Sequence, residues 1–503
     1  MSDPNIVLIV SDQHRADWMG CAGNSAVRTP HLDGLARDGV RFSAAYCAAP
    51  LCVPSRMALL TGRYPHHTGV YTNNASLPSG MPTYAHALGL AGYETVLCGR
   101  MHFVGADQRH GYERRLVGDL TACYLGGPRI DYAEWEGGQR QGLECLTVLG
   151  PGDSAVLRYD EAVVGACEEF VAARAGAAAS RPLLLTVGLF GPHSPFVCPP
   201  DLYARAVATS ANEPPLPPDP EPRHPWVADW FRRLEADRAS PEQIARARVN
   251  YVGLVDRLDQ LVGRVIAAAR ALPGPTIVVY LSDHGEMAGD RGMFWKQSFF
   301  EGAVKVPLIW CPLGSAVPAE TIVPERVVDL PVSLVDLAST LAALGGAPAL
   351  PATDGRALTP LLRGDPTPAE RAVWAARPIF SEAFIAGAPV RMVRRDQQKL
   401  IYYHGYEAVQ LFDLASDPDE RHDRGQATEL AMPRAALRGV LLADWDPDQI
   451  ARDLAARGAD ERYLARWGRE VGMGPLDLWP GGEIYRSGSV VDTARGDAGG
   501  GRR

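Results

Sequence analysis

Residues 276–285 read Thr-Ile-Val-Val-Tyr-Leu-Ser-Asp-His-Gly, an apolar run that ends in an acidic residue and a histidine. A short run rich in branched side chains predicts a buried β-strand. Three comparable runs also end in polar groups: residues 6–10 before Asp12-Gln13, residues 95–97 before Arg100 and His102, and residues 183–190 before His193. In open α/β sheets the active crevice lies beyond the carboxyl ends of the strands, so these side chains are predicted to meet at one edge.

The segments between these strands have the period of amphipathic helices. Residues 159–175 and 241–272 are rich in alanine, and the second segment places Val249, Val252, Val255, Leu258 and Val262 on one face. Strands that alternate with such helices predict an α/β fold whose sheet is covered on both sides.

Proline and glycine indicate the boundaries of the domains. A break at residues 364–368 divides a catalytic domain, residues 1–368, from a smaller carboxyl-terminal unit, residues 369–487, and residues 488–503 have the composition of a disordered tail. The proline-rich residues 212–223 are interpreted as a surface spacer loop in preference to a substrate lid.

The composition is that of a globular protein, with 46% hydrophobic and 22% charged residues among 503. A net charge of -9 without a basic block argues against a nucleic-acid partner. Nine scattered cysteines without paired spacing favour a reducing compartment. Residues 5–10 have no basic lead-in, so a buried strand is favoured over a signal peptide, and no apolar stretch is long enough to cross a bilayer. We therefore expect a soluble, cytoplasmic protein without a membrane partner.

The strongest local pattern is Cys52-Val-Pro54-Ser-Arg56, which continues to Thr61-Gly62-Arg63. Pro54 suits the first position of a helix and Thr61-Gly62 suits its end, so Cys52 is predicted at the amino-terminal tip. The helix dipole favours an anion there, and Arg56, one turn later, adds positive charge. A lone cysteine is more often a buried structural thiol.

Cys-x-Pro-Ser-Arg followed by Thr-Gly-Arg resembles the signature of type I sulfatases, a branch of the alkaline phosphatase superfamily. The resemblance implies the sulfatase fold: a large central, mostly parallel sheet flanked by helices, with a smaller carboxyl-terminal α+β subdomain. It also implies that a formylglycine-generating enzyme oxidises Cys52 to formylglycine. The complete string argues against a purely structural thiol at this position.

A second pattern combines Asp12-Gln13 with Asp283-His284. Ser-Asp after a strand is by itself often only a helix cap, whereas carboxylates gathered from several loops are typical of sites for hard divalent cations. Residues 283–301 resemble choline sulfatases, and phosphonate monoester hydrolases share Asp-Gln and Asp-His-Gly. The resemblance implies one divalent metal, Ca²⁺ or Mn²⁺, and these ligands: Asp12, Gln13, Cys52 as formylglycine, Asp283 and His284.

A third group consists of cations and hydrogen-bond donors that suit the oxygens of an anionic ester. The resemblance assigns catalytic roles to Cys52, Arg56, His102, His193 and Lys296, and substrate binding to Asn73, Arg100, His193 and Lys296. Arg100 departs from the family pattern, in which most relatives carry lysine. Other polar residues are assigned to surface, supporting, solvent-exposed or capping positions: His14, Arg15, His66, His67 and His110.

These patterns predict a sulfatase that hydrolyses aryl or small alkyl sulfate monoesters, with lesser activity on phosphonate monoesters and phosphate diesters. His193 or Lys296 would protonate the leaving alcohol, and His102 or Asp283 would act as the base. Trp226, Trp230 and Tyr112 are candidates for an aromatic cage around a choline group. A homo-oligomer is expected.

Two alternatives remain open. A phosphonate monoester hydrolase or phosphodiesterase would use the same site, although residues 99–112 look more like choline sulfatases. A non-catalytic binding relative would be expected to have lost Cys52, Asp283 or Lys296, and all three are present.

Overall fold

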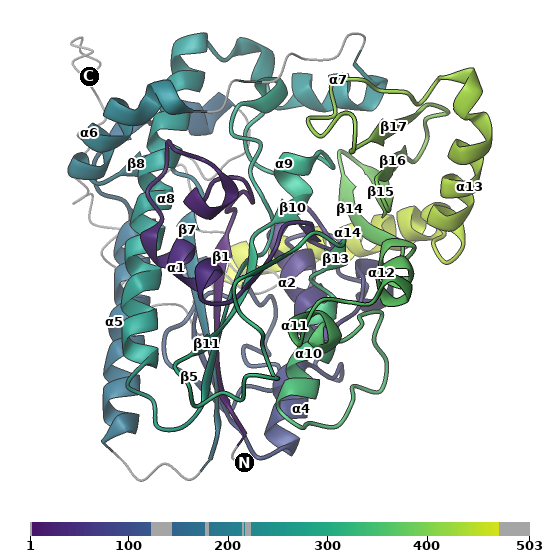
Figure 1. The fold of residues 1–503 in the computed structure, drawn as a ribbon. Coiled ribbons are helices and arrows are strands. Elements are labelled where there is room, and N and C mark those ends of the chain that lie inside the picture. The colour runs from purple at the N-terminus through teal and green to yellow at the C-terminus, as the bar shows by residue number, and fades with distance from the viewer. Residues whose placement is uncertain (1–2, 122–142, 177–180, 214–215, 217–222, 472–503) are drawn as a thin grey trace, which may run out of the picture.

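The centre of the molecule is an eight-stranded sheet with the strand order β12-β2-β11-β9-β1-β7-β4-β5 (Figure 1). The computed structural model describes residues 3–121, 143–176, 181–213, 216 and 223–471. The strands of this sheet are β1 (Asn5–Asp12), β2 (Val40–Phe42), β4 (Glu94–Gly99), β5 (Arg114–Arg115), β7 (Leu183–Pro192), β9 (Thr276–Ser282), β11 (Leu308–Leu313) and β12 (Arg326–Val328). Only β11 runs antiparallel to its two neighbours within this sheet, so the expected mostly parallel sheet is confirmed.

Helices cover both faces of the sheet, because the side chains of its strands alternate between two cores. Along β1, residues 6, 8 and 10 join one core and residues 7 and 9 join the other. On one side lie α1 (Pro30–Arg37), α5 (Ala155–Ala175) and much of α8 (Pro241–Ala269), and on the other lie α2 (Cys52–Thr61), α4 (Tyr84–Leu90) and α10 (Asp336–Leu344) (Figure 1). Each fully buried aliphatic side chain contributes about 1.5–3 kcal/mol of transfer free energy.

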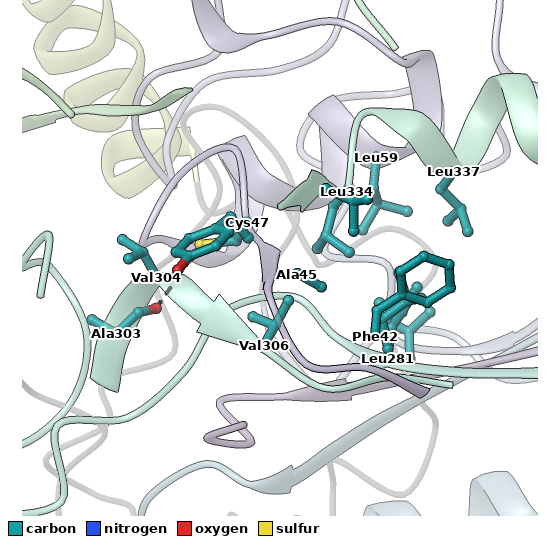
Figure 2. Packing of buried hydrophobic residues seen from close by; sticks show 14 of the residues in the cluster. Phe42, Ala45, Cys47, Leu59, Leu281, Ala303, Val304, Val306, Leu334 and Leu337 are labelled. Atoms are coloured by element: carbon teal, nitrogen blue, oxygen red, sulfur yellow. Dashed lines mark hydrogen bonds between the residues drawn. The ribbon is translucent and has the colours of Figure 1, made fainter. Parts of the chain in front are cut away.

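Helix α2 is buried over its whole length. It begins at Cys52 itself, so the prediction that Pro54 occupies the first helical position was wrong by two residues; proline is tolerated throughout a first turn, whose N–H groups have no partner within the helix. Gly62 ends the helix at a φ of 71°, as predicted. Leu59 packs among Phe42, Leu281, Leu334 and Leu337 (Figure 2), and this packing fixes the carboxyl-terminal half of the helix against the core.

A second, antiparallel sheet follows in the carboxyl-terminal part of the chain. It contains β14 (Ile379–Ile385), β15 (Ala388–Arg395), β16 (Gln398–Tyr403) and β17 (Val409–Asp413), with α13 (Ala431–Leu442) and α14 (Pro447–Val471) beside it (Figure 1). This smaller unit confirms the expected fold class. The proposed tail at residues 488–503 and most of the proline-rich segment lie outside the described residues.

The remaining elements are short connections. A small sheet joins β3 (Ala45–Tyr46), β10 (Lys305–Val306) and β13 (Val332–Ser333), and β6 (Gly150–Pro151) pairs with β8 (Val197–Cys198). The other α-helices are α3 (Pro65–Thr68), α6 (Pro200–Thr209), α7 (Pro225–Arg233), α9 (Glu301–Val304), α11 (Thr359–Leu362) and α12 (Pro368–Ala375). The 3₁₀ helices are Gly20–Ala22, Leu143–Leu146, Ser210–Asn212, Ala236–Arg238, Asp290–Gly292 and Thr428–Leu430.

The aromatic residues considered for a choline cage are used in packing. Trp226 on α7 stacks on Tyr403 with 4.8 Å between ring centroids, and Trp230 stacks on Trp226. Tyr112 is buried, and its hydroxyl is bonded to Tyr84 and to a threonine of β7. These residues therefore do not form an open cage. Within the described part of the chain, no helix combines the length and apolarity needed to cross a bilayer.

Candidate active site

The ends of four adjacent strands form the floor of the candidate site. Strands β9, β1, β7 and β4 are neighbours in the sheet and run parallel. Their carboxyl ends lead into Asp283-His284, Asp12-Gln13, His193 and Arg100, in that order across the sheet. The predicted meeting of these segments at one edge is confirmed.

Four side chains converge on a common centre at this edge. The ligand atoms of Asp12, Cys52, Asp283 and His284 all lie within 4.8 Å of one another. Cys52 Sγ is 3.1 Å from His284 Nε2 and 3.6 Å from Asp12 Oδ1. All four residues are buried. We call these four residues the central cluster.

Two arginines bind the outer oxygens of both aspartates. Arg56 donates from Nε to Asp283 Oδ2 at 2.8 Å and from Nη2 to Asp12 Oδ2 at 3.3 Å, and Arg100 Nε donates to the same Asp12 oxygen at 2.8 Å. Burial alone would raise the pKa of Asp12, but the positive charges of Arg100 and Arg56 hold that pKa well below its usual value. Both Oδ1 atoms lie on the side of the cluster, where each is within 3.6 Å of His284 Nε2.

The donor set of the central cluster fits a divalent cation. It offers two carboxylate oxygens, one imidazole nitrogen and the side chain of residue 52. His284 Nδ1 is 3.0 Å from the carbonyl of Gly285, a contact that turns Nε2 towards the centre. Burial lowers the pKa of His284, yet the negative charge of Asp283 and the hydrogen bond with Cys52 raise it above its ordinary value overall. The centre therefore favours a positive charge.

Gln13 lies beside the central cluster, and its side chain contacts two further charged residues. Its backbone N–H donates to Asp283 Oδ1 at 3.1 Å, whereas its Oε1 accepts from Lys296 Nζ at 2.6 Å and its Nε2 donates to Glu286. The implied role of Gln13 as a metal ligand stays a prediction, and its backbone contact with Asp283 places it directly beside the central cluster.

Lys296 and His193 form a second group near the centre. Lys296 Nζ is 2.6 Å from His193 Nε2, and His193 Nδ1 is 2.7 Å from the carbonyl of Ser194. A carbonyl only accepts, so the proton of the imidazole is on Nδ1 and Nε2 accepts from the ammonium. Burial, followed by the charge of Lys296, holds the pKa of His193 well below its usual value. His193 is therefore neutral, and the proton available in this pair belongs to Lys296.

Arg100 contacts protein groups on every side of its guanidinium. Besides Asp12, its Nη1 donates to Asp119 Oδ1 at 2.9 Å and its Nη2 lies 2.7 Å from His102 Nδ1, while Phe190 lies 4.1 Å from its central carbon. Arginine only donates, so His102 accepts at Nδ1 and carries its proton on Nε2. Burial and the charge of Arg100 hold the pKa of His102 well below its usual value. This geometry makes His102 a hydrogen-bond donor at Nε2, whereas the sequence analysis predicted it as a candidate base.

Three residues that support the site were missed from the sequence: Asp119, Thr121 and Glu286. Asp119 accepts from Arg100, from the backbone N–H of His102 and from the hydroxyl of Thr121. Counting the charges of the predicted site residues would have indicated that further carboxylates, such as Asp119 and Glu286, are needed. The predicted site has three permanent cations and only two aspartates, and a buried site of that kind needs further anions.

Asn73 and the residues set aside from the site are accounted for by local contacts. Asn73 Oδ1 accepts from the backbone N–H of Val53 at 3.0 Å, so it caps the first turn of α2. His14 and His110 are both buried, so a solvent-exposed or surface position is wrong for these two, whereas Arg15 is partly exposed and binds Asp17 and Asp290. His14 contacts Tyr280 and Trp18, and His110 packs on Phe103. His67 is half-exposed, as expected for a surface residue, and His66 binds the carboxylate of Glu382.

A parallel-sheet edge that gathers buried candidate cation ligands around a cysteine at a helix tip, backed by arginines, is typical of hydrolases of anionic esters. The chain belongs to the sulfatase family: the family profile described as "Sulfatase" matches residues 4–347, and "N-sulphoglucosamine sulphohydrolase, C-terminal" matches residues 289–442. The protein is accordingly an enzyme of the sulfuric ester hydrolase class.

Individual relatives agree with this assignment. The chain is 31% identical to a choline-sulfatase of Rhizobium meliloti (strain 1021), covering 92% of this chain and 90% of the relative. It is 34% identical to the steryl-sulfatase of Mus musculus over 72% of this chain and 65% of that protein. The phosphonate monoester hydrolase of Agrobacterium radiobacter has the same fold, with a TM-score of 0.69 at 23% identity over 88% of this chain and 95% of that one.

Proposed function

We propose that the protein hydrolyses sulfate monoesters with a formylglycine made from Cys52 and one divalent metal bound at the central cluster. The observation that carries this proposal is the convergence of Asp12, Cys52, Asp283 and His284 within 4.8 Å. Arg56 and Arg100 neutralise the outer oxygens of Asp12, and Arg56 does the same for Asp283. The inner oxygens are thereby left for a cation.

Asp12, Asp283, His284 and residue 52 would hold the metal. The imidazole nitrogen of His284 favours Mn²⁺ over Ca²⁺, because Ca²⁺ takes almost only oxygen ligands. Elemental analysis of the purified protein, followed by reconstitution of metal-free protein with each ion, distinguishes the two. Full activity with Ca²⁺ and none with Mn²⁺ would reverse the preference.

When present, the hydrated aldehyde supplies one hydroxyl to attack sulfur and a second whose oxygen re-forms the aldehyde as sulfate leaves, and the metal lowers the pKa of the first hydroxyl. Lys296 is the donor that gives a proton to the leaving alcohol oxygen, since His193 is neutral and accepts from it. His102 donates from Nε2 to an ester oxygen. In this tautomer the only acceptor nitrogen of His102, Nδ1, is occupied by Arg100. Of the two predicted bases, His102 and Asp283, Asp283 is therefore the remaining candidate.

The modification of Cys52 is tested by mass spectrometry of the intact peptide. Conversion replaces the Cβ–S bond and one Cβ–H bond with a Cβ=O bond, and sulfur leaves as hydrogen sulfide. Dioxygen, the oxidant, takes two electrons from Cβ and two from an external thiol reductant and yields water besides the aldehyde oxygen. The peptide becomes about 18 Da lighter. Protein from a host with the formylglycine-generating enzyme should show this change. Full activity of unmodified thiol protein would refute the proposal.

The substrate class is tested by steady-state rates on a panel. It contains 4-nitrophenyl sulfate, choline sulfate, a phosphate diester and a phosphonate monoester, the last two representing the phosphonate hydrolase alternative. We expect the highest kcat/KM with a sulfate monoester, and lesser turnover of the other two anions because all are tetrahedral and singly charged. A phosphonate monoester with a higher kcat/KM than every sulfate would transfer the proposal to that alternative. Choline sulfate is included because a relative carries that name.

The cellular compartment is proposed from the state of the cysteines. Seven cysteines in the described residues are free thiols, which suits a cytoplasmic, reducing compartment: Cys21, Cys47, Cys52, Cys98, Cys167, Cys198 and Cys311. A pull-down with a formylglycine-generating enzyme tests the proposed maturation partner.

A further inference from the structure

Asp160 is a buried carboxylate of helix α5 for which the mechanism above has no role. It is 3% exposed and lies in the second turn of the helix. Its Oδ1 accepts from the backbone N–H of Phe190 and its Oδ2 accepts from that of Gly191, both at 2.7 Å. Both of its oxygens are therefore bound to the end of strand β7, which leads directly into His193.

The end of β7 needs these acceptors because its ladder is interrupted there. The pairing of β1 with β7 is regular up to Gly188, and its register shifts before Pro192. The pairing of β4 with β7 also ends at Gly188. Phe190 and Gly191 lie in the irregular stretch, where a buried N–H without an acceptor would cost about 1–3 kcal/mol. Asp160 therefore stabilises this particular shape of the strand end.

The irregular stretch determines where His193 lies. The backbone N–H of His193 donates to the carbonyl of Phe190 at 3.3 Å, so residues 190–193 form a turn whose first two N–H groups are bound by Asp160. The ring of Phe190 packs edge-on against the imidazole of His193, with 5.1 Å between the ring centroids. In a close-packed interior, a displaced Phe190 backbone would shift both the turn and the imidazole.

The position of His193 in turn decides a hydrogen bond to the proton donor. His193 Nε2 lies 2.6 Å from Lys296 Nζ, and both side chains are buried. Hydrogen bonds of this kind have lengths of about 2.7–3.2 Å, so a shift of the imidazole by about 1 Å would break the contact. Misplacement of about 1 Å by a distant substitution can lower a rate about 100-fold. A series of direct contacts thus connects α5 to the Lys296 ammonium.

We propose that Asp160 is a positioning residue for the proton-transfer pair: it fixes the turn at the end of β7 and thereby the place of His193, to which the Lys296 ammonium donates. The inference rests on the proposed function, in which Lys296 protonates the leaving alcohol oxygen. It adds a residue of α5 that acts only through the backbone of β7.

Asp259 on α8 offers a matched control. It is also buried, and its two oxygens also accept from two successive backbone N–H groups, those of His31 and Leu32 at 3.2 and 2.9 Å. These residues belong to the start of helix α1 and not to the end of a site strand. Burial raises the pKa of Asp160 to about 7 and that of Asp259 to about 6. Assays at about pH 8.5 therefore keep both carboxylates ionised.

The test compares substrates with poor and good leaving groups. Asp160→Asn keeps the size of the side chain but has one acceptor oxygen, so its NH₂ faces one backbone N–H and that bond is lost. We expect kcat/KM for an alkyl sulfate to fall about 30-fold or more. The loss for 4-nitrophenyl sulfate should be less than about threefold, because nitrophenolate leaves without a proton. Asp259→Asn should change both values by less than about twofold, although it loses the same kind of bond.

A double-mutant cycle tests whether Asp160 acts through His193. In the His193→Ala background, Asp160→Asn should lower alkyl sulfate turnover by less than about threefold further, because the positioned group is gone. The full 30-fold loss in that background, or equal losses for both substrates in Asp160→Asn alone, would overturn the inference. If Asp160→Asn does not fold, Phe190→Leu removes the ring beside His193 and must show the same difference between substrates. Failure of the proposed function is separate, since the wild-type protein would then turn over no sulfate ester.

Discussion

Two groups of buried charges in this molecule use similar residues for different ends. In the central cluster and its arginines, Asp12 and Asp283 direct their outer oxygens to Arg56 and their inner oxygens to a shared centre. The second group, which we call the junction cluster, lies where α3 meets the carboxyl-terminal sheet. It consists of the buried side chains of His66, Glu382 and Arg391 together with Asp444, whose side chain is 51% exposed. There the contacts form a closed ring, in which each carboxylate oxygen faces a cation: His66 or Arg391.

The difference shows that buried charge by itself does not mark an active site. In the junction cluster, both carboxylate oxygens of Glu382 face a cation: Oε1 lies 2.8 Å from His66 Nδ1, and Oε2 lies 3.1 Å from Arg391 Nε. In the central cluster, Asp12 Oδ1 stays 3.5 Å from His284 Nε2, beside residue 52. A cation can therefore enter the central cluster but not the junction cluster. The central cluster suits chemistry, and the junction cluster suits stability.

Replacing the nucleophile should have the largest effect. We expect Cys52→Ala to lower kcat/KM for sulfate, phosphonate and phosphodiester substrates together by at least about 10⁴-fold, because one residue starts every reaction. Cys47→Ala, another buried thiol close by, is the matched control and should keep kcat/KM within about threefold. An activity that survives in Cys52→Ala would reveal a second site.

Removing the metal should come next. Chelation, or Asp283→Asn, is expected to lower kcat by at least about 10³-fold, because charge on the nucleophile and the sulfuryl oxygens loses its main stabiliser. Metal content measured beside the rate gives the check. Asp336→Asn, an equally buried aspartate that binds Arg377, should retain its metal. A metal-free wild-type protein that kept its rate would remove the distinction between the two clusters.

Opening the ring of the junction cluster should destabilise without changing the chemistry. Arg391→Met leaves Glu382 buried without its arginine, which costs about 3–5 kcal/mol of unfolding free energy. Urea denaturation measures this loss, and kcat/KM of the folded protein should stay within about threefold. Arg466→Met, which breaks an exposed pair with Glu470, should cost less than about 1 kcal/mol.

The junction cluster should also make stability depend on pH. Burial lowers the pKa of His66, but Glu382 and Asp444 raise it to about 9 overall, against about 6.5 in the unfolded chain. A raised folded-state pKa stabilises fully below about pH 6.5, and this contribution, at most about 3 kcal/mol, is lost as the pH rises through about 9. Urea midpoints between pH 6 and 10 should therefore fall more in the wild type than in His66→Gln. Parallel curves would contradict the charge assigned to His66.

Much of the site was predictable because it lies in short local patterns. Strand ends placed Asp12, Asp283 and His193, and the helix signals around Cys52 predicted its tip and its end at Gly62. The exact start of α2 was not predictable, since leucine at position 51 gives no capping signal. The tautomer of His102 was not predictable, because the contact between Arg100 Nη2 and His102 Nδ1 that decides it depends on the fold.

The sequence by itself determined the α/β order of elements, the nucleophile position and the residues that can bind a cation, because each depends on periodicity or on neighbours in the chain. Tertiary structure alone decided where side chains point. Gln13 contacts Lys296 and Glu286, which are more than 270 positions away in the chain. Asp119 meets Arg100 only because the chain returns to the sheet edge. A donor or acceptor must be paired when buried, and the partner is whichever group the fold brings within about 3 Å, which no local pattern contains.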